Sequence, residues 1–215
     1  RRLDAGEKLG QRGSLITHWY HLWGTLVPKF EPGLLQEFVR EGINKAGSLR
    51  KLREKTNWDQ KSIAAVRDGR NTITVEKLKS LLTFLDKSYD SVENKIIEIG
   101  GKRHRPLRNP KLPFNLKSVA GADVIAAGMG DGCVNQQHRH FQYIKMKYNP
   151  EHVKEVTKSV REVFGDIRPS ILRDEKGKKK GIEFHSAAIG IALERAGVTV
   201  GDKTMQECHV PDTIL

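Results

Sequence analysis

The sequence predicts an α+β protein in which an all-α segment precedes a unit with the element order αββαββα. Three patterns support this fold class. Residues 34–85 carry apolar side chains at helical spacing, and residues 117–134 are rich in alanine and glycine. Residues 139–148 alternate with a period of two, which is typical of strands, and residues 167–184 are predicted to form a hairpin that turns at residues 174–181.

Composition indicates an anionic partner. The chain has 215 residues, with 38 Lys and Arg against 26 Asp and Glu, a formal net charge of +12. Nucleic acid is the first candidate, and a membrane surface is the second, although no apolar run is long enough to span a bilayer. The two cysteines, Cys133 and Cys208, indicate neither a disulfide framework nor a zinc cluster, so a reducing cytoplasm fits. The first residues lack Met and lack a signal peptide, so we expect a fragment or a trimmed chain.

Residues 1–33 have no clear role. Residues 16–23 form an aromatic cluster that contains His18 and His21. The two histidines are possible metal ligands, but no third ligand lies at metal spacing. We therefore expect this segment to pack against the following domain.

Residues 34–86 predict a helix-turn-helix domain. Asp59 is placed to cap a helix over residues 60–67, Gly69 ends it, and Asn57 suits a left-handed turn before it. The spacing resembles helix-turn-helix domains of the Cro/repressor type. In that arrangement the side chains near the helix start face base edges and the later ones hold phosphates, which assigns Gln60, Lys61 and Ser62 to bases and Arg67, Arg70 and Asn71 to phosphates. A four-helix packing module with a solvated polar face is the alternative.

Residues 87–116 read as a basic linker. Three prolines and a run of positive charge favour an extended segment that lies along an acidic surface or a phosphate backbone. A solvated linker is the alternative reading.

The helix of residues 117–134 has a face almost without side chains. Ala122, Ala126 and Gly130 recur at i, i+4 and i+8, and Ala127 and Gly128 widen the face, so a second helix is expected to pack there. The helix is expected to end at Asp131 and Gly132. A carboxylate at the negative end of a helix dipole is disfavoured by roughly 0.3–1 kcal/mol unless a cation is near. The position of Asp131 therefore indicates a metal site. The alternative is that the helix only packs in the core and that Asp131 and Gly132 only form a turn.

After Gly132 the sequence predicts two hairpins and two helices. In residues 139–148, Gln142, Ile144, Met146 and Tyr148 are expected to point inward, and the odd-numbered residues toward DNA. A solvated edge hairpin is the alternative. Asn149 and Pro150 predict a helix start, and Ser186 is expected to cap the last helix. The predicted DNA contacts of this unit are Asn135, Gln137, Arg139, Tyr143, Lys145, Lys147 and the tip lysines Lys178, Lys179 and Lys180.

Residues 124–132, Val-Ile-Ala-Ala-Gly-Met-Gly-Asp-Gly, resemble the motif of the LAGLIDADG homing endonucleases and depart from it at Met129. Residues 109–116 look like the lead-in of archaeal members, and residues 193–204 and 210–215 look like their ending. The helix, hairpin, helix, hairpin, helix order also matches that family's core. The resemblance covers roughly residues 109–215, so the chain is divided into 1–33, 34–86, 87–116 and 117–215.

The resemblance implies a saddle-shaped sheet over DNA and a pair of small-residue helices, each delivering one carboxylate. Here that carboxylate is Asp131, which with Gly130 would hold Mg²⁺ or Mn²⁺ for phosphodiester hydrolysis. Because one motif is visible, we expect a homodimer or a second repeat beyond Leu215. The family's basic partner residue is missing, so His185 is a candidate proton shuttle, with a purely structural histidine as the favoured alternative, and Lys147 is a weaker candidate.

The sequence thus predicts a site-specific, magnesium-dependent endonuclease that cuts double-stranded DNA. The alternatives are a DNA-binding regulator that does not cut and an RNA-binding intron maturase on the same scaffold. An intein origin is possible, although no splicing residues are visible. The expected location is the prokaryotic cytoplasm, at the nucleoid.

Overall fold

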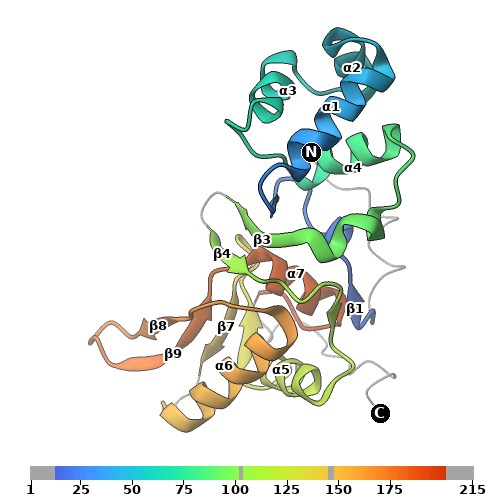
Figure 1. Ribbon diagram of the computed structural model, residues 1–215. Coiled ribbons are helices and arrows are strands. Elements are labelled where there is room, and N and C mark those ends of the chain that lie inside the picture. The colour runs from blue at the N-terminus through green and yellow to red at the C-terminus, as the bar shows by residue number, and fades with distance from the viewer. Residues whose placement is uncertain (1–12, 102–103, 145–147, 202–215) are drawn as a thin grey trace.

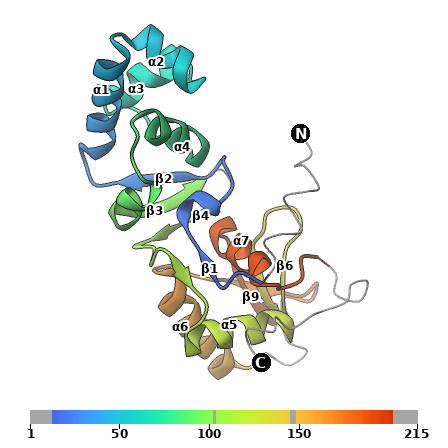
Figure 2. The ribbon, with the colours of Figure 1, turned by 90° about the vertical axis from the view of Figure 1, so that its right-hand side faces the viewer.

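The computed structural model describes residues 13–101, 104–144 and 148–201. In these ranges helices are mixed with strands, and the strands form three small antiparallel sheets. The helices of residues 34–84 lie at one end of the molecule, and the elements of residues 119–195 lie at the other (Figure 1, Figure 2). The predicted α+β class is therefore confirmed.

The four helices of the first unit begin and end close to where the sequence places them. They are α1 (Leu34–Ala46), α2 (Leu49–Thr56), α3 (Gln60–Arg67) and α4 (Val75–Phe84). Asp59 caps α3, because its side chain accepts a hydrogen bond from the Ser62 amide at 2.8 Å. Asn57 has a φ of 49° between α2 and α3. The predicted helix pair with a tight turn is therefore present.

Residues 87–116 are not an extended linker. They contain the 3-10 helix η2 (Tyr89–Lys95) and the strands β3 (Ile96–Gly101), β4 (His104–Arg108) and β5 (Phe114–Asn115). Residues from the N-terminal segment complete both sheets of this region: β1 (Ile16–Thr17) pairs with β5, and β2 (Val27–Phe30) pairs with β3. The apolar residues Ile96, Ile99 and Leu107 are buried there, so hydrophobic burial and strand pairing override the prediction made from proline and charge.

The last unit has the predicted order αββαββα. Its elements are α5 (Val119–Met129), β6 (Gly132–Val134), β7 (Phe141–Ile144), α6 (Pro150–Phe164), β8 (Ser170–Arg173), β9 (Lys179–Phe184) and α7 (Ala187–Arg195). The four strands form one antiparallel sheet in the order β6-β7-β9-β8. Helices α5 and α6 pack against each other (Figure 2). Asn149 caps α6 as predicted, whereas the side chain of Ser186 makes no capping bond to α7.

The end of α5 differs from the prediction. The helix ends at Met129, and Gly130 is its C-cap. Gly132 does not terminate the helix in a left-handed conformation but begins β6, where an added Cβ would lie 2.7 Å from the Ala127 carbonyl oxygen. Glycine is therefore needed here for close backbone approach rather than for positive φ.

The faces of β7 are the reverse of those predicted. Phe141 and Tyr143 are 0% and 6% exposed and belong to the core, whereas Gln142 and Ile144 are only partly covered. Tyr143 is therefore not available on an open DNA-facing surface. Lys145, Lys147 and Met146 lie outside the described residues. None of the helices in the described ranges is long and apolar enough to cross a bilayer.

Candidate functional site

One face of α5 is exposed and almost without side chains. Ala122, Ala126 and Gly130, the three residues at i, i+4 and i+8, are all exposed. Ala127 is partly covered. Gly128 is buried instead, and an added Cβ would lie 3.0 Å from a methyl group of Val198, so it belongs to the opposite, packed face. The predicted contact face therefore keeps three of its five residues fully exposed.

Asp131 follows the C-cap of α5 directly and is exposed. Its backbone carbonyl accepts a hydrogen bond from the Ile144 amide at 3.0 Å. This bond fixes the residue between the end of α5 and the end of β7. The carboxylate thus lies near the C-terminal carbonyl groups of a helix, a place that favours a cation.

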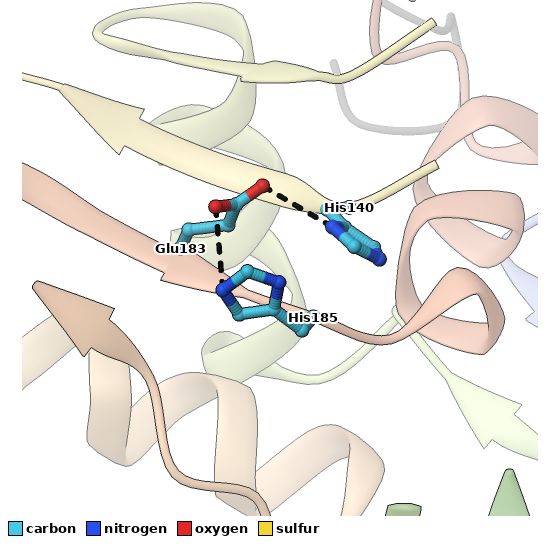
Figure 3. Close-up of side chains that lie close together, drawn as sticks. All are labelled: His140, Glu183 and His185. Atoms are coloured by element: carbon cyan, nitrogen blue, oxygen red, sulfur yellow. Dashed lines mark hydrogen bonds and ion pairs between the residues drawn. The ribbon is translucent and has the colours of Figure 1, made fainter. Parts of the chain in front are cut away.

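His185 belongs to a different cluster, which also contains His140 and Glu183 (Figure 3). Glu183 lies on β9, and its two carboxylate oxygens face the two rings. His140 Nδ1 is 3.2 Å from Oε1, and His185 Nε2 is 3.3 Å from Oε2. The rings of His140 and His185 are edge to face, with centroids 4.7 Å apart.

This cluster and Asp131 lie at different positions along β7. His140 and His185 adjoin the pair Phe141 and Phe184, and Glu183 pairs with Gln142. Asp131 adjoins Ile144, which is three residues after Phe141 and two after Gln142. Two to four residues of strand span about 7–13 Å. That His185 assists Asp131 stays a prediction, and in this structure the His185 ring faces Glu183.

Burial shapes the electrostatics of the cluster. His140 is 4% exposed, and this burial, together with the nearby His185, lowers its pKa; Glu183 opposes the shift. The folded protein thus favours a neutral His140 ring, the form that binds metals.

No spacing along the chain indicates this cluster. His140 lies more than 40 residues from Glu183 in the chain, and only the pairing of β7 with β9 brings them together. Glu183 and His185 are two residues apart, so extended backbone places both on one face. The second histidine, His140, comes from a different segment of the chain. The cluster therefore depends on tertiary structure.

A second group of possible metal ligands surrounds His18, which precedes the 3-10 helix η1 (Trp19–His21). His18 Nδ1 lies 2.9 Å from Glu93 and 3.7 Å from the exposed Asp90. Glu93 is buried and also accepts a hydrogen bond from the Trp19 amide. These bonds connect η2 to η1, so His18 has the packing role that the sequence predicts, and its three-residue group also has the residue types that could hold a metal ion.

The predicted DNA contacts of the helix-turn-helix divide into two sets. Gln60 and Lys61 are exposed at the start of α3, Ser62 is partly covered, and Asn71 is exposed. Arg67 and Arg70 instead both bind Asp68, at 2.7 and 2.9 Å. Their hydrogen bonds lower the pKa of Asp68 to about 2. The two arginines are thus engaged within the protein.

The remaining predicted contacts divide in the same way. Gln137, Lys178 and Lys179 are exposed, and Lys180 is partly covered. Arg139 binds Glu194 of α7 at 2.8 Å with its side chain 20% exposed, and its guanidinium lies 5.7 Å from the Trp23 ring. The Asn135 side chain accepts bonds from the amides of Gln137 and His138. Arg139 and Asn135 therefore hold the loop before β7.

Comparisons with protein-family models, curated proteins and solved structures gave no match. The resemblance to the LAGLIDADG family therefore stays a prediction that rests on the residues of this chain.

Proposed function

We propose that this protein is a site-specific DNA endonuclease of the LAGLIDADG type, active as a pair of αββαββα units. The observation that carries the proposal is the exposed small-residue face of α5, which leads directly to the exposed Asp131. Two such faces in contact would bring two carboxylates together, and twofold symmetry makes the contact self-complementary. A second copy of this chain is the simplest partner.

The donors at the end of α5 suit a hard cation. Asp131 supplies carboxylate oxygens and Gly130 a backbone carbonyl, and Mg²⁺ or Mn²⁺ would take its remaining ligands from water and phosphate. The chemistry that the bound cation supplies is a lower pKa for an attacking water. Asp131 would orient that water against the scissile phosphate. The net charge of +12 and the exposed tip lysines support binding of the DNA backbone.

The helix-turn-helix would add sequence recognition. Gln60 and Lys61 are exposed where a recognition helix meets base edges. Base contacts in the major groove give specificity, whereas the lysines of the β8-β9 turn position the backbone. In this proposal α3 recognises the DNA sequence, and the unit that contains Asp131 cleaves the DNA.

The test is cleavage of source genomic DNA by the full chain with Mg²⁺ or Mn²⁺, followed by sequencing of the new ends. Asp131→Asn is compared with Asp123→Asn, an exposed carboxylate on the same helix that accepts a bond from Ser159. Discrete ends with the wild type and Asp123→Asn, but not with Asp131→Asn, support the proposal. Ends that persist in Asp131→Asn overturn it.

A DNA-binding regulator that does not cut is the second candidate. It is favoured by the engagement of His185, whose Nε2 lies 3.3 Å from the Glu183 carboxylate. Fragments enriched on the protein without new ends would support this reading. Competition with duplex RNA in the same experiment tests the maturase alternative, because A-form grooves suit these strands poorly.

A further inference from the structure

We propose that His140, Glu183 and His185 form a binding site for a divalent transition-metal ion of the zinc class. One ligand atom from each residue lies within 4.8 Å of the other two (Figure 3). The proposed nuclease chemistry is assigned to Asp131 and Gly130 and does not use these residues. The inference therefore goes beyond the proposed function.

The distances are close to those of a coordination site. In a tetrahedral zinc site the metal–nitrogen and metal–oxygen distances are about 2.0–2.2 Å, which places neighbouring ligand atoms roughly 3.3–3.5 Å apart. His140 Nδ1 lies 3.2 Å from Oε1 of Glu183 and His185 Nε2 lies 3.3 Å from Oε2, so each ring faces a different oxygen of the carboxylate. One ligand atom from each residue lies within 4.8 Å of the other two, and a rotation of His185, whose side chain is 30% exposed, would bring the three atoms to coordination spacing.

The ligand set selects the class of ion. Two imidazoles and one carboxylate suit zinc and its neighbours in the first transition row, whereas Mg²⁺ prefers oxygen ligands only. Three protein ligands also leave a coordination position open. The exposed edge of His185 gives solvent access to that position, so a bound ion would keep a water ligand.

Neighbouring groups hold the ligands in place. Gln142 Nε2 donates a hydrogen bond of 3.0 Å to the Glu183 carboxylate, a contact of the kind that orients metal ligands. The Arg105 amide donates to the His185 carbonyl at 2.7 Å and so ties the end of β9 to β4. Because these elements are already fixed, little conformational entropy is lost when an ion binds.

The competing explanation is a hydrogen-bonded group without metal. Glu183 can accept bonds from His140, Gln142 and His185 at the same time, which satisfies a carboxylate that is 12% exposed. In that case the ring nitrogens carry protons, and zinc has no stronger affinity here than elsewhere on the surface. A metal titration separates the two explanations.

The experiment uses the full chain without a histidine tag, stripped with a chelator and incubated with ZnCl₂ or MgCl₂. We expect about one zinc per chain after desalting and a larger rise of Tm with zinc than with magnesium. His185→Asn, at a partly exposed position, should weaken zinc binding by at least about tenfold. His152→Asn, an exposed histidine on α6, is the matched control and should bind like the wild type.

Equal zinc retention by His185→Asn and the wild type, or no zinc retention by the wild type, would overturn the proposal. If His185→Asn does not fold, Co²⁺ titration of the wild type decides, since intense visible absorption requires ligation with fewer than six donors. Weak absorption like that of aqueous Co²⁺ contradicts the site. None of these outcomes depends on DNA cleavage, so failure here is distinct from failure of the Asp131 test.

Discussion

Gly190 is buried in α7 at a point where the helix touches the backbone of the loop before β7. An added Cβ would lie 1.8 Å from the Arg139 carbonyl oxygen. Since backbone cannot yield as a side chain can, we expect Gly190→Ala to lower the free energy of unfolding by about 3 kcal/mol or more. Urea unfolding followed by circular dichroism measures the change.

Gly128→Ala is the matched control, because Gly128 is also a buried helical glycine. Its added Cβ would meet the methyl groups of Val198 at 3.0 and 3.2 Å. A small movement of Val198 relieves this contact. The higher helix propensity of alanine relative to glycine adds about 1 kcal/mol to the free energy of unfolding, which offsets the cost of that movement. A near-neutral Gly128→Ala is therefore expected. If both substitutions cost the same, the rigid contact with Arg139 is not the reason for glycine in α7.

At the scale of the element, α3 begins with the exposed Gln60 and Lys61, and Arg67 at its end and Arg70 just beyond it both bind Asp68. Asp68→Asn should free Arg67 and Arg70 for phosphate contacts. We expect tighter binding to duplex DNA of arbitrary sequence, and a slope of log K against log salt that is steeper by about 1 to 2. Fluorescence anisotropy at several salt concentrations measures both quantities.

Asp166→Asn changes the net charge by the same unit and provides the control. The Asp166 carboxylate accepts a bond from the Asn109 amide at 2.7 Å rather than from an arginine. The affinity of Asp166→Asn for DNA should rise less than that of Asp68→Asn, because only the overall charge changes. Equal slopes for the two variants would mean that Arg67 and Arg70 do not reach DNA.

Elements with local signals were predictable from the sequence, and elements with distant partners were not. The helices α1–α4 follow from apolar spacing and from caps such as Asp59, which act within one turn. Strand β3 was missed because its partner β2 lies about 70 residues earlier, and β4 was missed because its proline and positive charge pointed to a linker, although its partner β3 is adjacent in the chain. The faces of β7 were inverted because alternation gives two faces but not which one is buried; Phe141 and Tyr143 are inward by tertiary packing.

The same distinction between local signals and distant partners applies to the candidate site. Asp131 and the small face of α5 could be read from one helix, since the spacing of Ala122 and Ala126 is local. The partnership of His140 with Glu183 depends on strand pairing across more than 40 residues. The engagement of Arg139 with Glu194 was likewise invisible, because α7 approaches the loop only in the folded chain.

At the scale of the whole molecule, η1 lies where the three parts of the chain meet. His21 is near His18 of its own segment, Lys79 of α4 and Arg195 of α7. Burial lowers the pKa of His21 to about 4, and the positive charges of Arg195, His18 and Lys79 add to the effect, while Asp90 opposes it. A protonated His21 is therefore unfavourable only when these parts are assembled.

This arrangement predicts how stability depends on pH. Above pH 6.5, the ordinary pKa of histidine, His21 is neutral in both the folded and the unfolded chain. Between pH 6.5 and about 4 the unfolded chain binds a proton that the folded protein does not, so the free energy of unfolding decreases as pH falls. His140, whose pKa is also lowered, acts in the same direction.

We expect His21→Gln to flatten this decrease of the free energy of unfolding, because glutamine does not titrate. Its side-chain oxygen can still accept the hydrogen bond that the His18 amide donates to the His21 ring. Thermal unfolding from pH 7.5 to 4 measures the effect, with the exposed His152→Gln as control. A pH profile of His21→Gln that is parallel to the wild type would show that the junction does not exclude this proton.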